Sequence, residues 1–229
     1  GVYTVRVFDL VYSGSGCHIY RLSIGTVPRV VFSVPTFVQV GTSSEVQLFG
    51  WNLGDSASLS NGSRYESITT RITAPESGFS KLPFRLSPAQ IETAGFAHHY
   101  PGSQTPIRIG FSDVPVTLET EGRSSPAVAQ LVAVPTEVSG QLVANGELDW
   151  YRVRVKRGEV LWLEAFGERI GSAVDLDISI LDETGEREFA RFSDQQQNVG
   201  GPRLPTAHSD PSGRWVCPAA GAYLVLVRS

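Results

Sequence analysis

Four aspartates in the second half of the chain could bind a metal ion. They are Asp149, Asp175, Asp177 and Asp182. Calcium is a hard cation that takes about six to eight oxygen ligands, so these carboxylates are candidates for a Ca²⁺ site. Aspartates also cap turns and keep the exposed faces of strands solvated. The sequence leaves both interpretations open, and Ca²⁺ is the one cofactor that it suggests.

Aromatic side chains form the second group of candidates. Tryptophans and tyrosines can stack on sugars or on a collagen-like fibre, although in β-proteins large aromatics more often fill cores and domain contacts. Tyr65 and Tyr100 fall in predicted loops. We therefore expect these two tyrosines to be the most exposed members of any aromatic binding platform.

Arrangements that would support catalysis are incomplete. His98 and His99 are adjacent in a predicted extended segment, where neighbouring side chains point to opposite sides and rarely chelate one ion. No Gly-x-Ser-x-Gly turn presents a nucleophilic serine. Cys17 and His18 are neighbours in sequence, which does not give a thiolate and a base the geometry they need. We predict that the protein is not an enzyme.

The composition is that of a folded globular chain with many turns. The 229 residues include 23 glycines and 14 prolines, which fits short strands in two β-sandwiches of about 100 residues each. The net charge of −4 offers no basic stripe for nucleic acid. No apolar run approaches the roughly 18 to 20 residues of a membrane span, so we predict no transmembrane segment.

The two ends of the chain repeat one pattern. Residues 1–9 and 221–229 share a glycine, a tyrosine and two valines at matching positions, and each copy alternates apolar side chains as a strand buried on one face does. A second alternating stretch, 20–24, follows a turn at 13–16. We predict a strand pair over 1–25 and a tandem repeat. Two strands cannot form a core alone, so the pair must complete a sheet of a preceding domain, of the last domain or of a neighbouring protomer.

The two cysteines, Cys17 and Cys217, match no metal-binding spacing. One interpretation is two unrelated buried thiols. The other is a disulfide, within the chain or between successive units, because both cysteines lie close to the repeated strand. A disulfide would require an oxidising compartment.

A series of strands and turns follows the first pair. The segments Pro28–Pro35, Val38–Gly41 and Val46–Gly54 resemble the beginning of the IPT/TIG immunoglobulin-like fold, with its Pro-x-Val strand, its Val-x-x-Gly turn and its Val-x-Leu-x-Gly-x-Asn-Leu ending. The resemblance implies an immunoglobulin-like sandwich over 26–118. Within it, Ser87–Gln90 has the form of a short helix start.

The strongest family signature lies in the second half of the chain, after a polar stretch at 112–125 that we interpret as a linker. Its elements in order are Gly146–Val155, Lys156–Glu159, Leu161–Phe166, Gly171–Asp182, Pro202–Leu204 and Pro218–Tyr223. This order resembles the bacterial pre-peptidase C-terminal (PPC) domain, with its Lys-x-Gly-Glu turn and its closing Pro-x-x-Gly-x-Tyr strand. The resemblance implies a jelly-roll-like sandwich over 119–229, and residues 1–25 resemble the terminal strands of the same domain.

The PPC resemblance also bears on calcium. Some PPC-like domains, notably the collagen-binding domains of clostridial collagenases, bind Ca²⁺ through an acidic segment at the domain entrance. Here Arg123 and Ser124 stand where that family has an Asn-Asp pair, and Gly201 replaces another aspartate. The calcium ligands that the resemblance implies are therefore only partly present.

Together these features predict an all-β chain of two antiparallel β-sandwiches, immunoglobulin-like and then jelly-roll-like, with an N-terminal strand pair that completes a PPC-type sheet. We expect a non-catalytic structural or adhesive module from a bacterium, secreted, periplasmic or on the cell surface. Its partners would be other protein units, met through strand edges and by strand exchange between successive units. The alternatives are a calcium-dependent module for collagen-like or polysaccharide ligands and an accessory region of a secreted hydrolase.

Overall fold

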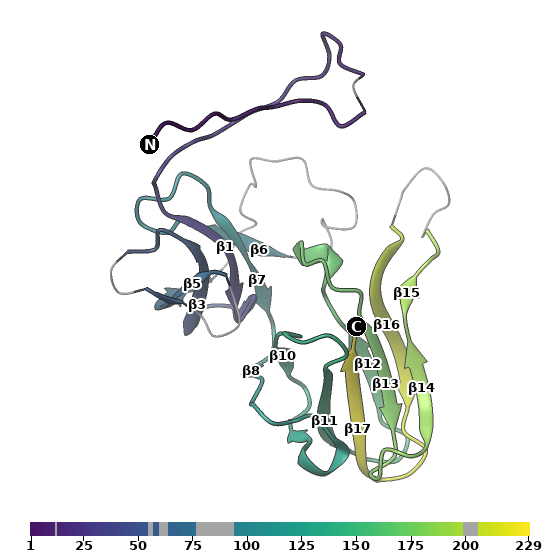
Figure 1. Cartoon of the computed structure of the whole chain (residues 1–229). Coiled ribbons are helices and arrows are strands. Elements are labelled where there is room, and N and C mark those ends of the chain that lie inside the picture. Colours follow the sequence, from purple (N-terminus) through teal and green to yellow (C-terminus); the bar gives the residue numbers. More distant parts are fainter. Residues whose placement is uncertain (12, 55–56, 60–63, 77–93, 199–205) are drawn as a thin grey trace.

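Strands dominate the part of the chain that the computed structural model describes (Figure 1). That part comprises residues 1–11, 13–54, 57–59, 64–76, 94–198 and 206–229. Within it the only helical elements are two short 3-10 turns, η1 (Pro126–Val128) and η2 (Glu168–Ile170), and most strand pairs are antiparallel. The all-β prediction is confirmed. The predicted helix start at Ser87–Gln90 and the Pro202–Leu204 segment lie outside the described residues.

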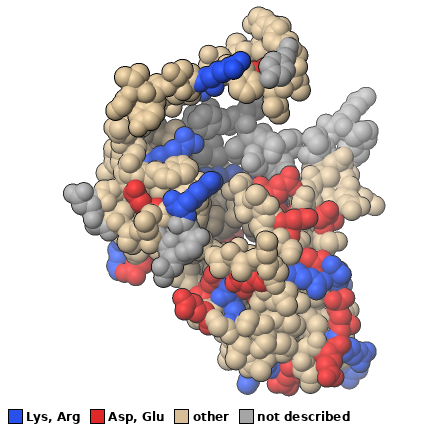
Figure 2. Space-filling view, viewed as in Figure 1, with Lys and Arg blue, Asp and Glu red and all other residues tan. Residues whose placement is uncertain are grey.

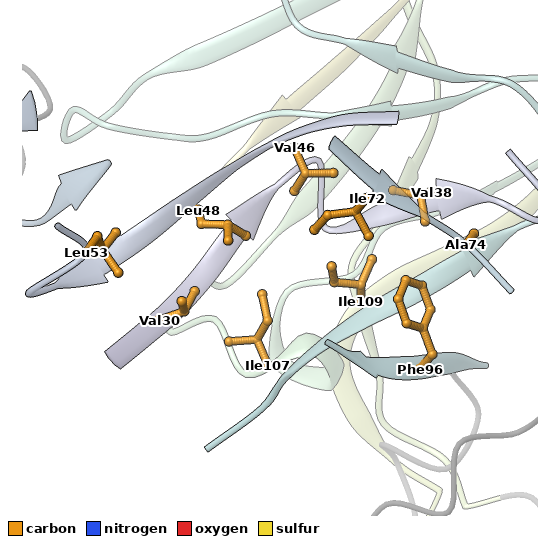
Figure 3. Packing of buried hydrophobic residues seen from close by; sticks show 10 residues of the cluster. All are labelled: Val30, Val38, Val46, Leu48, Leu53, Ile72, Ala74, Phe96, Ile107 and Ile109. Atoms are coloured by element: carbon orange, nitrogen blue, oxygen red, sulfur yellow. The ribbon is translucent and has the colours of Figure 1, made fainter. Parts of the chain in front are cut away.

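Two sheets in the N-terminal half share one core. Their strand orders are β1-β3-β5-β4 and β2-β7-β6. The bounds are β1 Arg29–Val34, β2 Phe37–Gln39, β3 Ser43–Trp51, β4 Ser58–Leu59, β5 Glu66–Thr73, β6 Gly95–His98 and β7 Ile107–Ser112. Figure 3 shows side chains from both sheets pointing toward one another: Val30, Val38, Val46, Leu48, Leu53, Ile72, Ala74, Phe96, Ile107 and Ile109. In β3, fully buried Val46 and Leu48 alternate with less buried Glu45 and Gln47, which is the period of two that a strand requires.

Two further sheets form the C-terminal half. The five-stranded sheet has the order β14-β13-β17-β11-β9, and the three-stranded sheet has the order β12-β16-β15. The bounds are β9 Gln130–Leu131, β11 Leu148–Val155, β12 Val160–Glu164, β13 Asp177–Leu181, β14 Glu188–Phe192, β15 Asp194–Gln195, β16 His208–Val216 and β17 Gly221–Arg228. Tyr151, Val153 and Val155 of β11 meet Leu161 and Trp215 of the smaller sheet in a shared core. This inward face of β11 is the one that its alternation predicts.

The closing strand β17 lies in the middle of the five-stranded sheet, between β13 and β11. It buries both faces rather than the single face that the sequence pattern predicts. Tyr223 joins the core between the sheets, while Leu224 and Leu226 pack with Trp150 and Leu181 on the opposite side. The second face is buried because Leu224 and Leu226 replace the polar residues that a one-sided strand would carry there.

The two halves meet at a small number of described contacts. In the predicted linker 112–125, β8 (Val116–Leu118) pairs in parallel with β10 (Glu137–Ser139). The Thr36 backbone N–H donates to Ser139 Oγ at 3.3 Å. Phe37 packs over Gly110, where a Cβ would lie only 2.2 Å from its ring, and its ring centroid is 5.3 Å from that of Phe166. The predicted linker therefore contains a strand, and the division into domains at 1–25, 26–118 and 119–229 stays a prediction.

The N-terminal segment, residues 1–27, contains no assigned strand in its described residues, 1–11 and 13–27. We call this segment the arm. Figure 1 shows it above the N-terminal half as two extended stretches joined at their far end, the second of which leads into β1. The predicted strand pair is thus not formed within this chain, because two strands without a third strand or a facing layer bury too little apolar surface to be stable.

A buried ion pair anchors η2 to the three-stranded sheet. The Arg169 and Asp210 side chains are each only 1% exposed, and Arg169 Nε donates to Asp210 Oδ2 at 2.8 Å. The same carboxylate accepts the backbone N–H groups of Gly167, Glu168 and Arg169. Asp210 lies in β16 and the three donors lie at η2, so the pair fixes η2 on the three-stranded sheet.

The substitution Asp210→Ala should lower the free energy of unfolding by about 3 to 5 kcal/mol, because it removes the carboxylate from a buried guanidinium. Urea denaturation followed by tryptophan fluorescence measures the loss. The matched control is Glu183→Ala, since Glu183 pairs with Arg152 at 3.0 Å but its side chain is 67% exposed, and the expected cost is below about 1 kcal/mol. Equal losses in the two variants would contradict the assigned role of Asp210.

Candidate functional site

The arm displays an unusual amount of apolar surface. Its exposed large apolar side chains are Val2, Tyr3, Val5, Val7, Phe8, Leu10, Val11, Ile19, Tyr20, Leu22, Ile24 and Val27. Ile19 is 90% exposed and Tyr3 is 89% exposed. Figure 2 shows the arm as a ridge with few charged side chains, in contrast to the mixed charges over the C-terminal sheets. Contiguous apolar surface of this kind is typical of a protein interaction site.

Strand β12 forms an edge of the three-stranded sheet. In the described residues it pairs only with β16, from Val160 opposite Val216 to Glu164 opposite Ser212. Leu161 points into the core, whereas Val160 and Trp162 on the other face are 48% and 66% exposed. Trp162 is the most exposed tryptophan of the described chain, whereas the sequence predicts Tyr65 and Tyr100 to be the exposed aromatic residues. Its outward position has no signal in the sequence, because residues 160–163 are all apolar and do not show which face of the strand is buried.

The two tyrosines predicted to be exposed are instead packed into the N-terminal half. Tyr65 is half-buried, and its ring centroid lies 5.6 Å from that of Phe32 and 5.0 Å from that of Trp51. Tyr100 packs against the core, and its hydroxyl donates to the Leu53 carbonyl at 2.5 Å. Both tyrosines therefore help to hold loops in place. Of the aromatic residues packed with Tyr65, Trp51 remains exposed to solvent, at 40%.

Three of the four candidate calcium ligands have other partners. Asp149 pairs with Arg123 at 3.0 Å, and Asp177 pairs with Arg191 at 2.8 Å and Arg228 at 3.1 Å. Asp182 accepts the backbone N–H groups of Thr184 and Glu186 and so caps the turn between β13 and β14, while Asp175 is exposed. Among the described residues, no group of three or more His, Cys, Asp or Glu side chains is arranged to hold a metal ion.

A second buried cluster surrounds Arg123. Its side chain is 7% exposed and contacts the carboxylates of Glu119 and Asp149, and its backbone carbonyl accepts the Trp150 N–H at 3.2 Å. Burial raises the pKa of Asp149 and of Glu119, while Arg123 acts in the opposite direction. Burial also raises the pKa of the adjacent Tyr151 to about 12. A fixed cation thus occupies the place where the PPC resemblance implies calcium ligands.

The two cysteines are free thiols in different environments. Cys17 is exposed in the arm, and Cys217 is buried, with its thiol donating to the Ala219 carbonyl at 2.9 Å. The structure does not join them in one chain. The histidine pair is split as its adjacency predicts, with His98 half-buried in β6 and His99 exposed. Burial lowers the pKa of His98.

No family model and no curated protein matches the chain. Within the described residues, no helix has the length and apolar character that crossing a membrane would require.

The Arg123 cluster gives a pH-dependent prediction. Because the folded pKa values of Asp149 and Glu119 are raised, the folded chain binds protons that the unfolded chain has released, and their contribution to stability falls as pH rises through that interval. Arg123→Met removes the charge that opposes the shift. It should therefore cost roughly 3 kcal/mol at pH 7 and clearly less near pH 4.

Urea denaturation at both pH values measures this difference. Arg154→Met is the matched control, since Arg154 is exposed on the neighbouring strand β11. Its effect should be small at both pH values. A cost of Arg123→Met that does not change with pH would contradict the assigned role of the cluster.

Proposed function

We propose that the chain is a non-catalytic structural or adhesive module that assembles with other protein units by strand addition. In this proposal the N-terminal half is an immunoglobulin-like sandwich of the IPT/TIG type and the C-terminal half is a jelly-roll-like sandwich of the PPC type. The compartment would be the periplasm, the cell surface or the medium of a bacterium. The observation that carries the proposal is the arm, whose alternating apolar side chains lie in solvent.

Strand addition accounts for both the extended backbone of the arm and its exposed, alternating apolar side chains. A sheet edge supplies the backbone hydrogen bonds that an extended segment needs, and the facing core covers every second side chain. In the arm, Tyr20, Leu22 and Ile24 alternate with Ile19, Arg21 and Ser23, and all three members of the first set are exposed. An acceptor sheet would remove that set from water at a gain of about 1.5 to 3 kcal/mol for each large apolar side chain.

The repeated sequence supports the same interpretation. Residues 1–9 share their pattern with β17, which is a central strand with neighbours on both sides. A segment with that pattern is suited to a fully paired place in a sheet. The arm therefore has the sequence of sheet strands and lacks, within the described chain, the sheet that would hold them.

The chain should associate in a concentration-dependent way, and Leu22→Lys should weaken association about tenfold or more, because it places a charge where an apolar side chain is buried. Sedimentation equilibrium over a range of concentrations measures both effects. Leu22 is 50% exposed, so the substitution leaves the described cores intact.

Val143→Lys is the control, since Val143 is 79% exposed and lies outside the arm and the strands. It should leave association unchanged. A chain that stays monomeric at all concentrations, or an association insensitive to Leu22→Lys, would contradict the proposal.

A further inference from the structure

We infer that the acceptor of the arm is the free edge of β12 in a second copy of the chain. Residues 19–24 would add antiparallel to β12, with Arg21 opposite Trp162. This inference rests on the proposed strand addition and names its partner surface and register. The general proposal does not say which sheet edge accepts the arm, and the described sheets have several edges besides β12.

Strand β12 differs from those other edges in length, regularity and surface. It has five residues and pairs with β16 without a register shift. The edge strands β4, β9 and β15 have two residues each, β2, β8 and β10 have three, and β6 has four. The longer edges β1 and β14 carry a bulge or irregularity in their pairing. Among the described edge strands, β12 alone has two large apolar side chains that are exposed, Val160 and Trp162. Edges that are not meant to pair are usually blunted by charges, bulges or short length.

The two faces of the arm strand match the two faces of β12. In the antiparallel register with Arg21 opposite Trp162, Leu22 lies opposite Leu161 and Tyr20 lies opposite Leu163. Leu161 is buried and Leu163 is half-buried at the margin of the core. Tyr20 and Leu22 would therefore extend this core by one strand, since alternate residues of paired strands share a face.

The outward face of the pair is also complementary. Arg21 would lie beside the exposed indole of Trp162, where a guanidinium is attracted to the aromatic face. Ser23 would lie opposite Val160, and the small serine leaves room for its exposed side chain. The pairing thus covers the most exposed tryptophan of the described residues and places Arg21 against it.

A second copy fits this arrangement better than the same chain. Only residues 25–27 separate Ile24 from Pro28, just before β1 begins at Arg29, and such a link spans at most about 14 Å. Figure 1 shows the arm above the N-terminal half and well separated from β12. Residues 19–24 are therefore held near the N-terminal half of their own chain and are directed toward other molecules.

The register can be tested by cross-linking two chains. One chain carries Ser23→Cys and the other carries Val160→Cys, both with Cys17→Ser to remove the exposed thiol of the arm. A short bismaleimide reagent is added to the mixture, and mass spectrometry identifies the joined peptides. We expect a link between positions 23 and 160 of different chains. The control acceptor carries Gln195→Cys on β15, the opposite edge of the same sheet, and should link poorly.

A charge exchange tests the pair of side chains. Trp162→Lys places a cation opposite Arg21 and removes the aromatic face, so association should weaken about tenfold. Arg21→Glu in the same chain should restore it. Trp162 is 66% exposed, so thermal unfolding should be unchanged, and Val143→Lys serves again as the matched control.

The outcomes separate this inference from the function on which it rests. A monomeric chain would overturn the proposed function and the inference with it. Association that depends on Leu22 but not on Trp162, or a link to position 195 rather than 160, would overturn only the choice of β12. A 23–160 link that forms within one chain carrying both cysteines, but not between the two singly substituted chains, would overturn the second copy as the partner.

Discussion

An extended segment with apolar side chains and unpaired backbone groups is stable only when a sheet edge and a core cover it. The folded parts of this chain satisfy that constraint internally, and β17 satisfies it most completely, with a strand on each side and buried side chains on both faces. The arm has the same kind of sequence and does not satisfy it within the described chain. The proposed assembly starts from this difference, since the sheet that would cover the arm is not among the described residues.

Two buried arginines form ion pairs that join separate segments of the C-terminal half. Arg169 binds η2 to β16 through Asp210, and Arg123 binds the segment after β8 to β11 through Asp149. Both guanidinium groups are buried. Their charges are therefore balanced by neighbouring carboxylates and not by solvent. Arg169 also contacts Glu164 at the end of the edge strand β12, at 2.7 Å, and β12 pairs with β16 along its length. An edge that is held in this way can accept a strand without first being ordered itself.

The alternation of apolar residues and the chemistry of the turns predicted more of this structure than the types of individual residues did. The inward face of β11 and the capped turn at Asp182 could be read from alternation and turn chemistry. The burial of Arg123 could not, because it lies in a polar stretch and depends on two carboxylates brought close by folding. Tyr100 was assigned to an exposed surface because its partner, the Leu53 carbonyl, is 47 residues away. The exposure of Trp162 also depends on topology, since only the sheet order makes β12 an edge.

The most direct test of the account is backbone amide exchange in the arm and in β12, measured by mass spectrometry below and above the concentration at which the chain associates. Strand addition supplies hydrogen bonds to both partners at once. The account predicts that residues 19–24 and 160–164 gain protection together as association proceeds. Arm amides that exchange as freely in the associated chain as in the monomer would contradict it.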